Sequence, residues 1–259
     1  MKKSLLLAIL LFASHSIYAA SNTQPQHIDP ALAKAQQLIK AQDYHAAYQE
    51  LEGLSEQGNA QATYNLAYLN ETGKGVASNP KQALALYQKA AAAGYAKAHY
   101  ALAQHYSAGR LGLNADPAKA KQHLEQAVQQ GSPEASIELA FLLFAEDTPA
   151  SAQKASQLLA PLIQQKDPQA IHIQALYNIN QGLKNTNPAL TSQGLDQIKL
   201  LAEKGYIPAL MMMADIFAKG DIVEQDLAEA EKIYSLLSQD NVPQAKQRLQ
   251  EVKQQIAAK

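Results

Sequence analysis

A repeat of about 36 residues is the feature that most constrains how this chain can fold. Residue types that tolerate a positive φ recur at spacings of 36, 37, 36, 38 and 36 residues, at Gly58, Gly94, Gly131, Asp167, Gly205 and Asn241. Gly, Asn and Asp are the residues that end helices in the left-handed conformation. Self-similarity at such a period is typical of stacked repeats, each of which is one supersecondary unit. The sequence therefore predicts a repeat protein.

A second column of turn residues divides each period into two helices. It lies fifteen residues after the first column, at Gly73, Gly109, Glu146, Gly182 and Gly220. Between the columns, small or apolar residues recur every four positions, which places them on one face of a helix. The first of these positions is occupied by Ala62, Ala98, Ala135, Ile171, Ala209 and Ala245.

The second helix of each period has its own pattern. A small residue stands eleven positions before the capping residue, at Ala47, Ala83, Ala120, Ser156, Gly194 and Ala230. Small residues allow two helices to approach closely, which favours antiparallel helix pairs. Proline begins or precedes the second helix, where a missing N–H costs little. These prolines are Pro80, Pro117, Pro149 and Pro188.

These features resemble the Sel1-like repeat (SLR) family, a subclass of the tetratricopeptide-type α-solenoids. The match is strongest over residues 60–98, through Ala62, Leu66, Gly73-Lys74-Gly75, Pro80, Ala83, Tyr87, Gly94 and Ala98. Later units repeat the pattern, the last through Ala209, Phe217, Gly220, Ala230 and Tyr234. The resemblance implies an all-α, right-handed α-solenoid of antiparallel helix pairs with capping helices.

The repeat columns also predict the organisation of the chain. We expect an N-terminal helix pair over residues 30–58 and a C-terminal capping helix over 242–259. Between them lie five repeat units, 59–94, 95–131, 132–167, 168–205 and 206–241. Units 132–167 and 168–205 are degenerate, because Glu146 replaces a turn glycine and Asp167 replaces a capping glycine.

Residues 1–19 have the layout of a secretory signal peptide. Lys2 and Lys3 precede the apolar stretch from Leu5 to Ala13, which is too short to span a membrane because a span needs about 20 apolar residues. Cleavage after Ala19 leaves a polar lead-in over residues 20–29, and an uncleaved N-terminal anchor is the alternative. We therefore expect a periplasmic or secreted protein with no stable membrane span after cleavage.

Composition argues against nucleic-acid binding and against most kinds of catalysis. The net charge is -1, and Arg110 and Arg248 are the only arginines, so donors for phosphates and bases are scarce. Cysteine is absent, and no HExxH or GxSxG motif occurs. The histidines show no metal-ligand spacing, although His99 and His172 share one predicted repeat column. We predict a non-catalytic protein with no cofactor and no metal; the alternative is a cell-wall or β-lactam-acting hydrolase.

The first helices carry a candidate binding surface. Positions two and six after the small residue lie opposite the buried face and hold Tyr64 and Tyr68, Tyr100 and Gln104, Ile137 and Phe141, Ile173 and Tyr177, and Met211 and Asp215. Tyrosine combines a large apolar ring with a polar tip, which suits partner recognition. We therefore predict that the concave face binds a segment of another cell-envelope protein. The candidate binding residues are Tyr64, Tyr68, Tyr100, Gln104, Phe141 and Tyr177.

Two matters stay open at this stage. Position two is half-buried against the next helix pair in tetratricopeptide-type repeats, so Tyr64 and Tyr100 have a purely structural alternative. The family resemblance also implies two roles, an assembly factor for envelope machinery or an immunity protein that blocks a toxin from a neighbouring cell.

Overall fold

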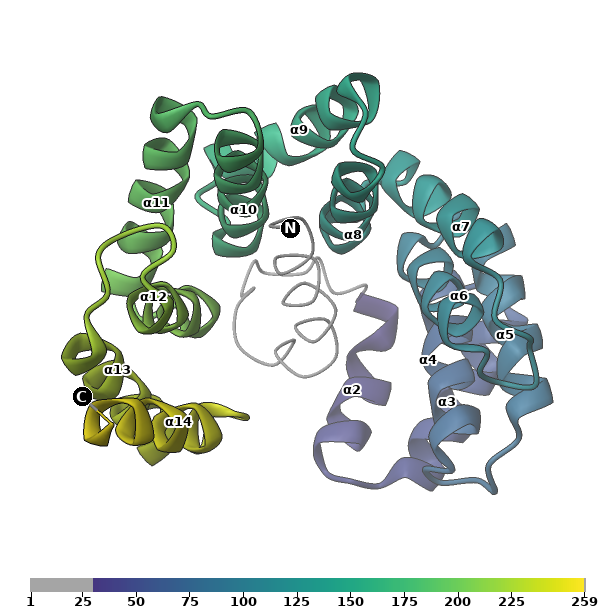
Figure 1. The fold of residues 1–259 in the computed structure, drawn as a ribbon. Coiled ribbons are helices and arrows are strands. Elements are labelled where there is room, and N and C mark those ends of the chain that lie inside the picture. Colours follow the sequence, from purple (N-terminus) through teal and green to yellow (C-terminus); the bar gives the residue numbers. More distant parts are fainter. Residues whose placement is uncertain (1–29, 259) are drawn as a thin grey trace. The chain divides into compact units, whose positions relative to one another are not determined.

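The computed structural model describes residues 30–258, which form helices joined by short turns without any strand (Figure 1). The predicted signal peptide and the lead-in up to residue 29 lie outside the described residues. The all-α solenoid predicted from the repeat pattern is confirmed, because successive helices pair in antiparallel fashion and neighbouring pairs pack on one another within each of two compact units. A search of the helices in this part of the chain finds none with the length and hydropathy of a membrane span.

The chain divides into two compact units between Leu158 and Leu159. In the first, a short 3-10 turn at Pro30–Leu32 leads into α2 and α3. The pairs α4–α5 and α6–α7 and then α8 follow, and α9 crosses the boundary. Their bounds are α2 Ala33–Lys40, α3 Tyr44–Glu56, α4 Ala60–Thr72, α5 Pro80–Ala92, α6 Ala96–Ala108, α7 Pro117–Gln129, α8 Pro133–Ala145 and α9 Pro149–Gln164.

The second unit, residues 159–258 of the described chain, contains two further pairs and a final helix. Their bounds are α10 Pro168–Lys184, α11 Pro188–Glu203, α12 Ile207–Lys219, α13 Leu227–Gln239 and α14 Ala245–Ala257. The final helix packs on α13, where Val252 and Leu249 contact the buried ring of Tyr234 and its neighbours.

Local capping explains where the helices begin and end. Asn59, Asp116 and Ser132 each accept a hydrogen bond from the amide three residues on, at 2.9, 3.0 and 3.1 Å. Such a cap stabilises a helix by roughly 1 kcal/mol. The predicted prolines occupy the first position of α5, α7, α9 and α11. Gly73, Gly109 and Gly220 end the first helices in the left-handed conformation, as predicted.

The core lies between neighbouring helix pairs. One cluster joins α2, α3 and α4, and it contains Leu32, Ala35, Leu51, Ala62, Leu66 and Leu69. The next joins α4, α5 and α6, and it contains Ala67, Ala83, Tyr87, Ala90, Ala91, Ala98 and Leu102. Because α4 contributes to both clusters, no pair buries its apolar face alone, and stacking supplies the stability.

The predicted register is wrong by one residue around the boundary between units 132–167 and 168–205. Lys166 takes the positive φ of 61°, whereas Asp167 has a φ of -61° and caps the start of α10. The small buried residues are consequently Ala155 and Ala170, each 0% exposed, and not Ser156 and Ile171, which are only half-buried. Asp is a strong helix N-cap, and that role decides its position here.

Gly182 corrects a second detail, because it lies inside α10 and not in a turn. The helix continues to Lys184, and the positive φ falls on Thr186. A Cβ on Gly182 would lie 2.3 Å from Thr191 Oγ1 and 2.6 Å from Thr191 N. Glycine at this position therefore permits the close approach of α11 to α10.

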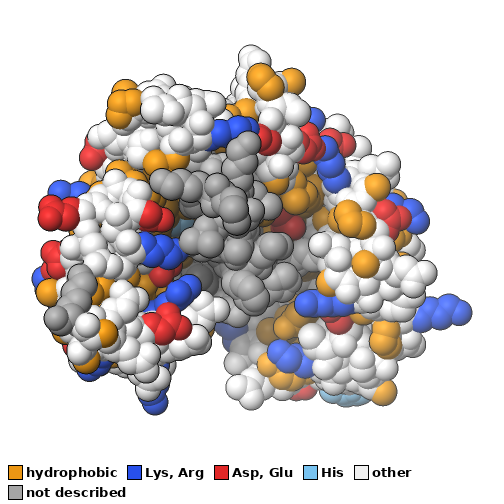
Figure 2. Space-filling view, in the orientation of Figure 1, with side chains coloured by type: hydrophobic (Ala, Val, Ile, Leu, Met, Phe, Trp, Pro, Cys, Tyr) orange, Lys and Arg blue, Asp and Glu red, His pale blue; other side chains and the backbone are white. Residues whose placement is uncertain are grey.

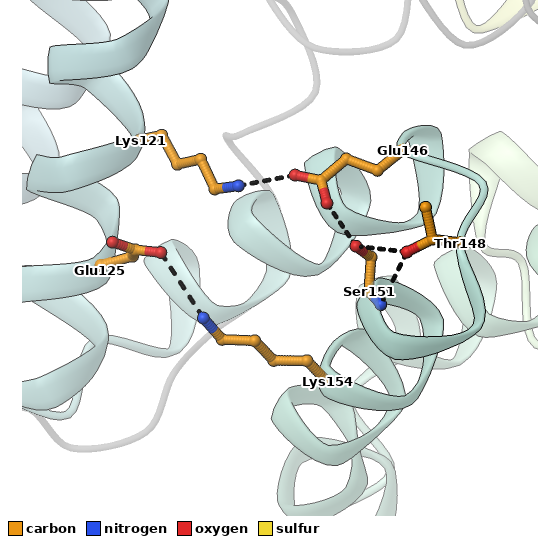
Figure 3. A network of polar contacts seen from close by, with 6 residues as sticks. All are labelled: Lys121, Glu125, Glu146, Thr148, Ser151 and Lys154. Atoms are coloured by element: carbon orange, nitrogen blue, oxygen red, sulfur yellow. Dashed lines mark hydrogen bonds and ion pairs between the residues drawn. The ribbon is translucent and has the colours of Figure 1, made fainter.

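Glu146 replaces the turn glycine of its unit without adopting a positive φ. It has a φ of -68°, and the next residue, Asp147, takes the left-handed conformation. Its carboxylate accepts hydrogen bonds from Lys121 Nζ at 2.6 Å and from the Ser151 hydroxyl (Figure 3). These bonds, that of Lys121 foremost, hold the pKa of Glu146 below its usual value. The side chain thus ties the α8–α9 turn to α7.

Candidate interaction surface

The first helices of successive repeats, α4, α6 and α8, line one side of the unit formed by residues 30–158, and α5 and α7 line the other (Figure 1). Positions two and six of the first helices carry the predicted binding residues. The structure separates these two positions on α4 and α6, because position two turns toward the neighbouring pair or is half-buried and position six is exposed.

Position two belongs to the packing between repeats. The Tyr64 ring centroid lies 5.5 Å from that of Tyr87 and 5.3 Å from that of Tyr95. Burial, with a contribution from Glu71, raises the pKa of Tyr64. The equivalent Ile137 on α8 is only 7% exposed. Tyr64 therefore stabilises the stack and offers little area to a partner.

Tyr100, at the same position of α6, is half-buried. Its burial matches the structural alternative considered for position two, and Tyr100 is therefore a weaker candidate than the position-six residues.

Position six forms the accessible part of the surface. Tyr68 is 45% exposed, Gln104 is exposed, and Phe141 is half-buried. The ammonium group of Lys74 lies 5.5 Å from the centroid of the Tyr68 ring and 5.3 Å from that of Tyr44. The Lys74 ammonium group thus makes cation–π contacts with both rings, including the exposed Tyr68 ring. We call Tyr68, Gln104 and Phe141 the position-six surface.

Tyr177 does not belong to this repeat position, because of the shift in register. With Ala170 as the small residue, position two is His172 and position six is Leu176. Tyr177 lies half-buried one residue further on, in the unit formed by residues 159–258. The same shift removes the predicted equivalence of His99 and His172.

A buried polar contact that the sequence analysis missed connects α4, α5 and α6. Tyr87 Oη donates to Glu71 Oε2 at 2.7 Å, and His105 Nε2 lies 3.5 Å from the same oxygen. The contact with His105, together with the Tyr87 hydrogen bond, holds the pKa of Glu71 below its usual value despite burial. Burial and the Glu71 carboxylate raise the pKa of Tyr87. The carboxylate, the phenol and the imidazole thus fasten one pair to the next.

The same device recurs in the second unit. Tyr234 Oη donates to Asp215 Oδ1 at 2.5 Å, and Arg248 Nε on α14 lies 3.7 Å from that oxygen. Tyr87 and Tyr234 occupy one repeat column, and Asp215 is at position six of α12. A tyrosine in this column with an acid on the preceding helix is the signal that could have predicted both contacts.

The charge distribution does not favour a polyanionic ligand. On the face shown in Figure 2, acidic and basic side chains alternate with apolar ones, and neither sign forms a continuous patch. Among residues 30–258, no three His, Cys, Asp or Glu side chains come together as metal ligands. Met212 and Met213 pack against one core cluster, and Met211 packs against the next.

Comparison with known proteins supports the class of fold that the geometry defines, an α-solenoid of stacked helix pairs. The model of the Sel1 repeat matches residues 60–95, 96–132 and 207–241. A Sel1 repeat protein from Oxalobacter formigenes is 24% identical, with a TM-score of 0.69 over 85% of this chain and 87% of that chain. No match was found among curated proteins.

Two further solved structures share the fold. One is c5321, a protective antigen of uropathogenic Escherichia coli with an SLR fold, at 22% identity and a TM-score of 0.70 over 87% of this chain and 49% of that chain. The other is immunity protein Pa5087 from Pseudomonas aeruginosa, at 20% identity and a TM-score of 0.51 over 84% and 86%. This chain carries three matched Sel1 repeats in a solenoid with the SLR fold, and such repeats imply a protein–protein interaction scaffold.

Proposed function

We propose that this chain is a non-catalytic scaffold of the bacterial cell envelope that binds a segment of a partner protein on the position-six surface. The observation that carries the proposal is the exposure of Tyr68 on a first helix of the repeat stack, next to Gln104 and Phe141 at the equivalent positions. An exposed aromatic ring, supported by a cation and flanked by a polar group, has the character of an interface anchor.

The cell-envelope location rests on the leader pattern of residues 1–19. Within that location we propose two roles, an assembly factor or an immunity protein against a delivered toxin. The fold likeness to the P. aeruginosa immunity protein is compatible with the second role. An immunity protein forms a stable one-to-one complex, whereas an assembly factor binds several partners more weakly.

The hydrolase alternative has less support from the arrangement of side chains. The two carboxylates best placed for acid–base work, Glu71 and Asp215, are each engaged by a buried tyrosine. His105, whose Nε2 lies 3.5 Å from the Glu71 carboxylate, is only 5% exposed. We therefore propose that these groups stabilise the stack.

Site-specific photo-crosslinking in the native host tests the scaffold proposal. A photoreactive amino acid is placed at position 68 or 104, and as a control at Gln88, which is exposed on the second helix α5. We expect one or a few protein adducts from positions 68 and 104 and none from position 88. Equal adducts from all three positions, or none from 68 and 104, would contradict the proposal.

A further inference from the structure

Two histidines that are 24 residues apart in sequence meet inside one helix pair. His99 lies on α6 and His123 on α7, and their Nδ1 atoms are 2.9 Å apart. The ring centroids are 5.2 Å apart with an interplanar angle of 39°. The pair lines a cleft with Gln122, Glu125 and Gln126. A small ligand can therefore reach the two rings from solvent.

The two imidazoles are hydrogen-bonded to each other. At an Nδ1–Nδ1 distance of 2.9 Å, one Nδ1–H donates to the lone pair of the other ring. Each neutral imidazole keeps one nitrogen lone pair, and this is the form that binds metals.

The surroundings hold both rings in place. The His123 ring stacks on that of Tyr106, with centroids 5.3 Å apart and an interplanar angle of 13°. A hydrogen bond to the backbone of Ala91 orients His99. Ring orientation by an outer contact of this kind is characteristic of metal-binding histidines.

The donor set favours one kind of metal. The 2.9 Å between the two Nδ1 atoms is the length of their hydrogen bond and fixes no coordination angle. Imidazole nitrogens and water oxygens suit Cu²⁺, which binds such ligands more tightly than Ni²⁺ or Zn²⁺.

We propose that His99 and His123 bind one Cu²⁺ ion through their Nδ1 atoms, with water completing the coordination. The ion replaces the hydrogen bond between the two rings, and the ring that donated its Nδ1–H carries that proton on Nε2 instead, so that both rings bind as neutral imidazoles. Glu125 lines the same cleft, but its carboxylate is paired with Lys154 at 3.5 Å (Figure 3). The ion would clamp α6 to α7.

The test is a Cu²⁺ titration of the full-length protein without a polyhistidine tag, followed by calorimetry and electron paramagnetic resonance. We expect one equivalent of Cu²⁺ with hyperfine coupling from two nitrogens, and a higher thermal midpoint with the ion bound. His99→Gln and His123→Gln should each abolish this equivalent. His45→Gln, at an exposed histidine on α3, should retain it.

Other results would overturn the proposal. Equal Cu²⁺ binding by the wild type and the His99→Gln, His123→Gln double variant would show an adventitious ion. Coupling to a single nitrogen, or binding of Zn²⁺ as tight as that of Cu²⁺, would contradict a copper site built from the two histidines. Circular dichroism of each variant checks that the helices remain intact, so that lost binding reports on the ligands.

Discussion

The phenol of Tyr87 donates to the carboxylate of Glu71 at 2.7 Å, and Tyr234 makes the equivalent bond to Asp215 at 2.5 Å. Each tyrosine ring is almost fully buried. Each pair is completed by a basic side chain from the next first helix or from the final helix. The repeat therefore places a charged contact between neighbouring helix pairs. Removing the tyrosine hydroxyl leaves a partly buried carboxylate without its hydrogen-bond donor.

We expect Tyr87→Phe to lower the free energy of unfolding by about 1–3 kcal/mol, because Glu71 loses a hydrogen bond in a partly buried site. Urea unfolding followed by circular dichroism measures the loss. Tyr48→Phe is the matched control, since Tyr48 is a tyrosine that packs against a core cluster but is only partly buried. Equal losses in both variants would show that the Tyr87 hydroxyl contributes nothing.

We expect a substitution of Gly75 to destabilise the protein strongly, because a side chain there would clash with the backbone. It has a φ of 75°, and a Cβ there would lie 2.2 Å from the carbonyl oxygen of Tyr44. Gly58 has a similar φ of 88°, but nothing lies within 4 Å of its Cβ position. Gly58→Ala should cost about 1 kcal/mol of conformational strain. Gly75→Ala should cost clearly more, and equal unfolding midpoints for the two variants would contradict the steric account.

The corrected register predicts opposite outcomes for the same substitution at two positions of α9. Ala155 is 0% exposed, whereas Ala160 is exposed. Ala155→Leu should destabilise the protein by about 1–3 kcal/mol through overpacking. Ala160→Leu should change the free energy of unfolding by less than about 0.5 kcal/mol. A lower thermal midpoint for Ala160→Leu than for Ala155→Leu would contradict the corrected register and support the one predicted with Asp167 at the end of α9.

His172 makes stability depend on pH in a defined window. Burial lowers its pKa from 6.5 to about 4, and its Nδ1 atom has no hydrogen-bond partner. Below pH 6.5 the unfolded chain binds a proton that the folded protein rejects, so this contribution to stability is complete above pH 6.5 and is lost as the pH falls toward 4.

We therefore expect the wild type to lose roughly 3 kcal/mol more than His172→Gln between pH 7 and pH 4. Urea titrations at several pH values measure the difference. His45→Gln serves as a control for an exposed histidine. Parallel stability curves for the wild type and His172→Gln would show that His172 titrates normally in the folded protein.

The repeat fold could be predicted because its strongest signals are local. Glycine at the end of a helix, proline at its start and a small residue at each close approach each have a direct conformational cause. The register around Lys166 could not be predicted, for two reasons. A positive φ is unusual for lysine, and Asp167 could equally end one helix with a positive φ or cap the start of the next. Only the buried side of α10 distinguishes the two.

The candidate site was less accessible to sequence reasoning. The repeat columns place Tyr64 and Tyr68 on the first helix, but the stacking of Tyr64 between Tyr87 and Tyr95 depends on the next pair. The contact of His99 with His123 crosses the turn between α6 and α7. No spacing rule within one helix predicts such a pair.

Binding of the captured partner to surface variants tests the central claim most directly. The measurement is the dissociation constant of the wild type, Tyr68→Ala and Leu236→Ala, because Leu236 is 52% exposed on the second helix α13 and is a matched apolar control. We predict at least about 30-fold weaker binding for Tyr68→Ala, which corresponds to an anchor worth about 2 kcal/mol, and unchanged binding for Leu236→Ala. Unchanged binding by Tyr68→Ala, or an equal loss in both variants, would contradict recognition by the position-six surface.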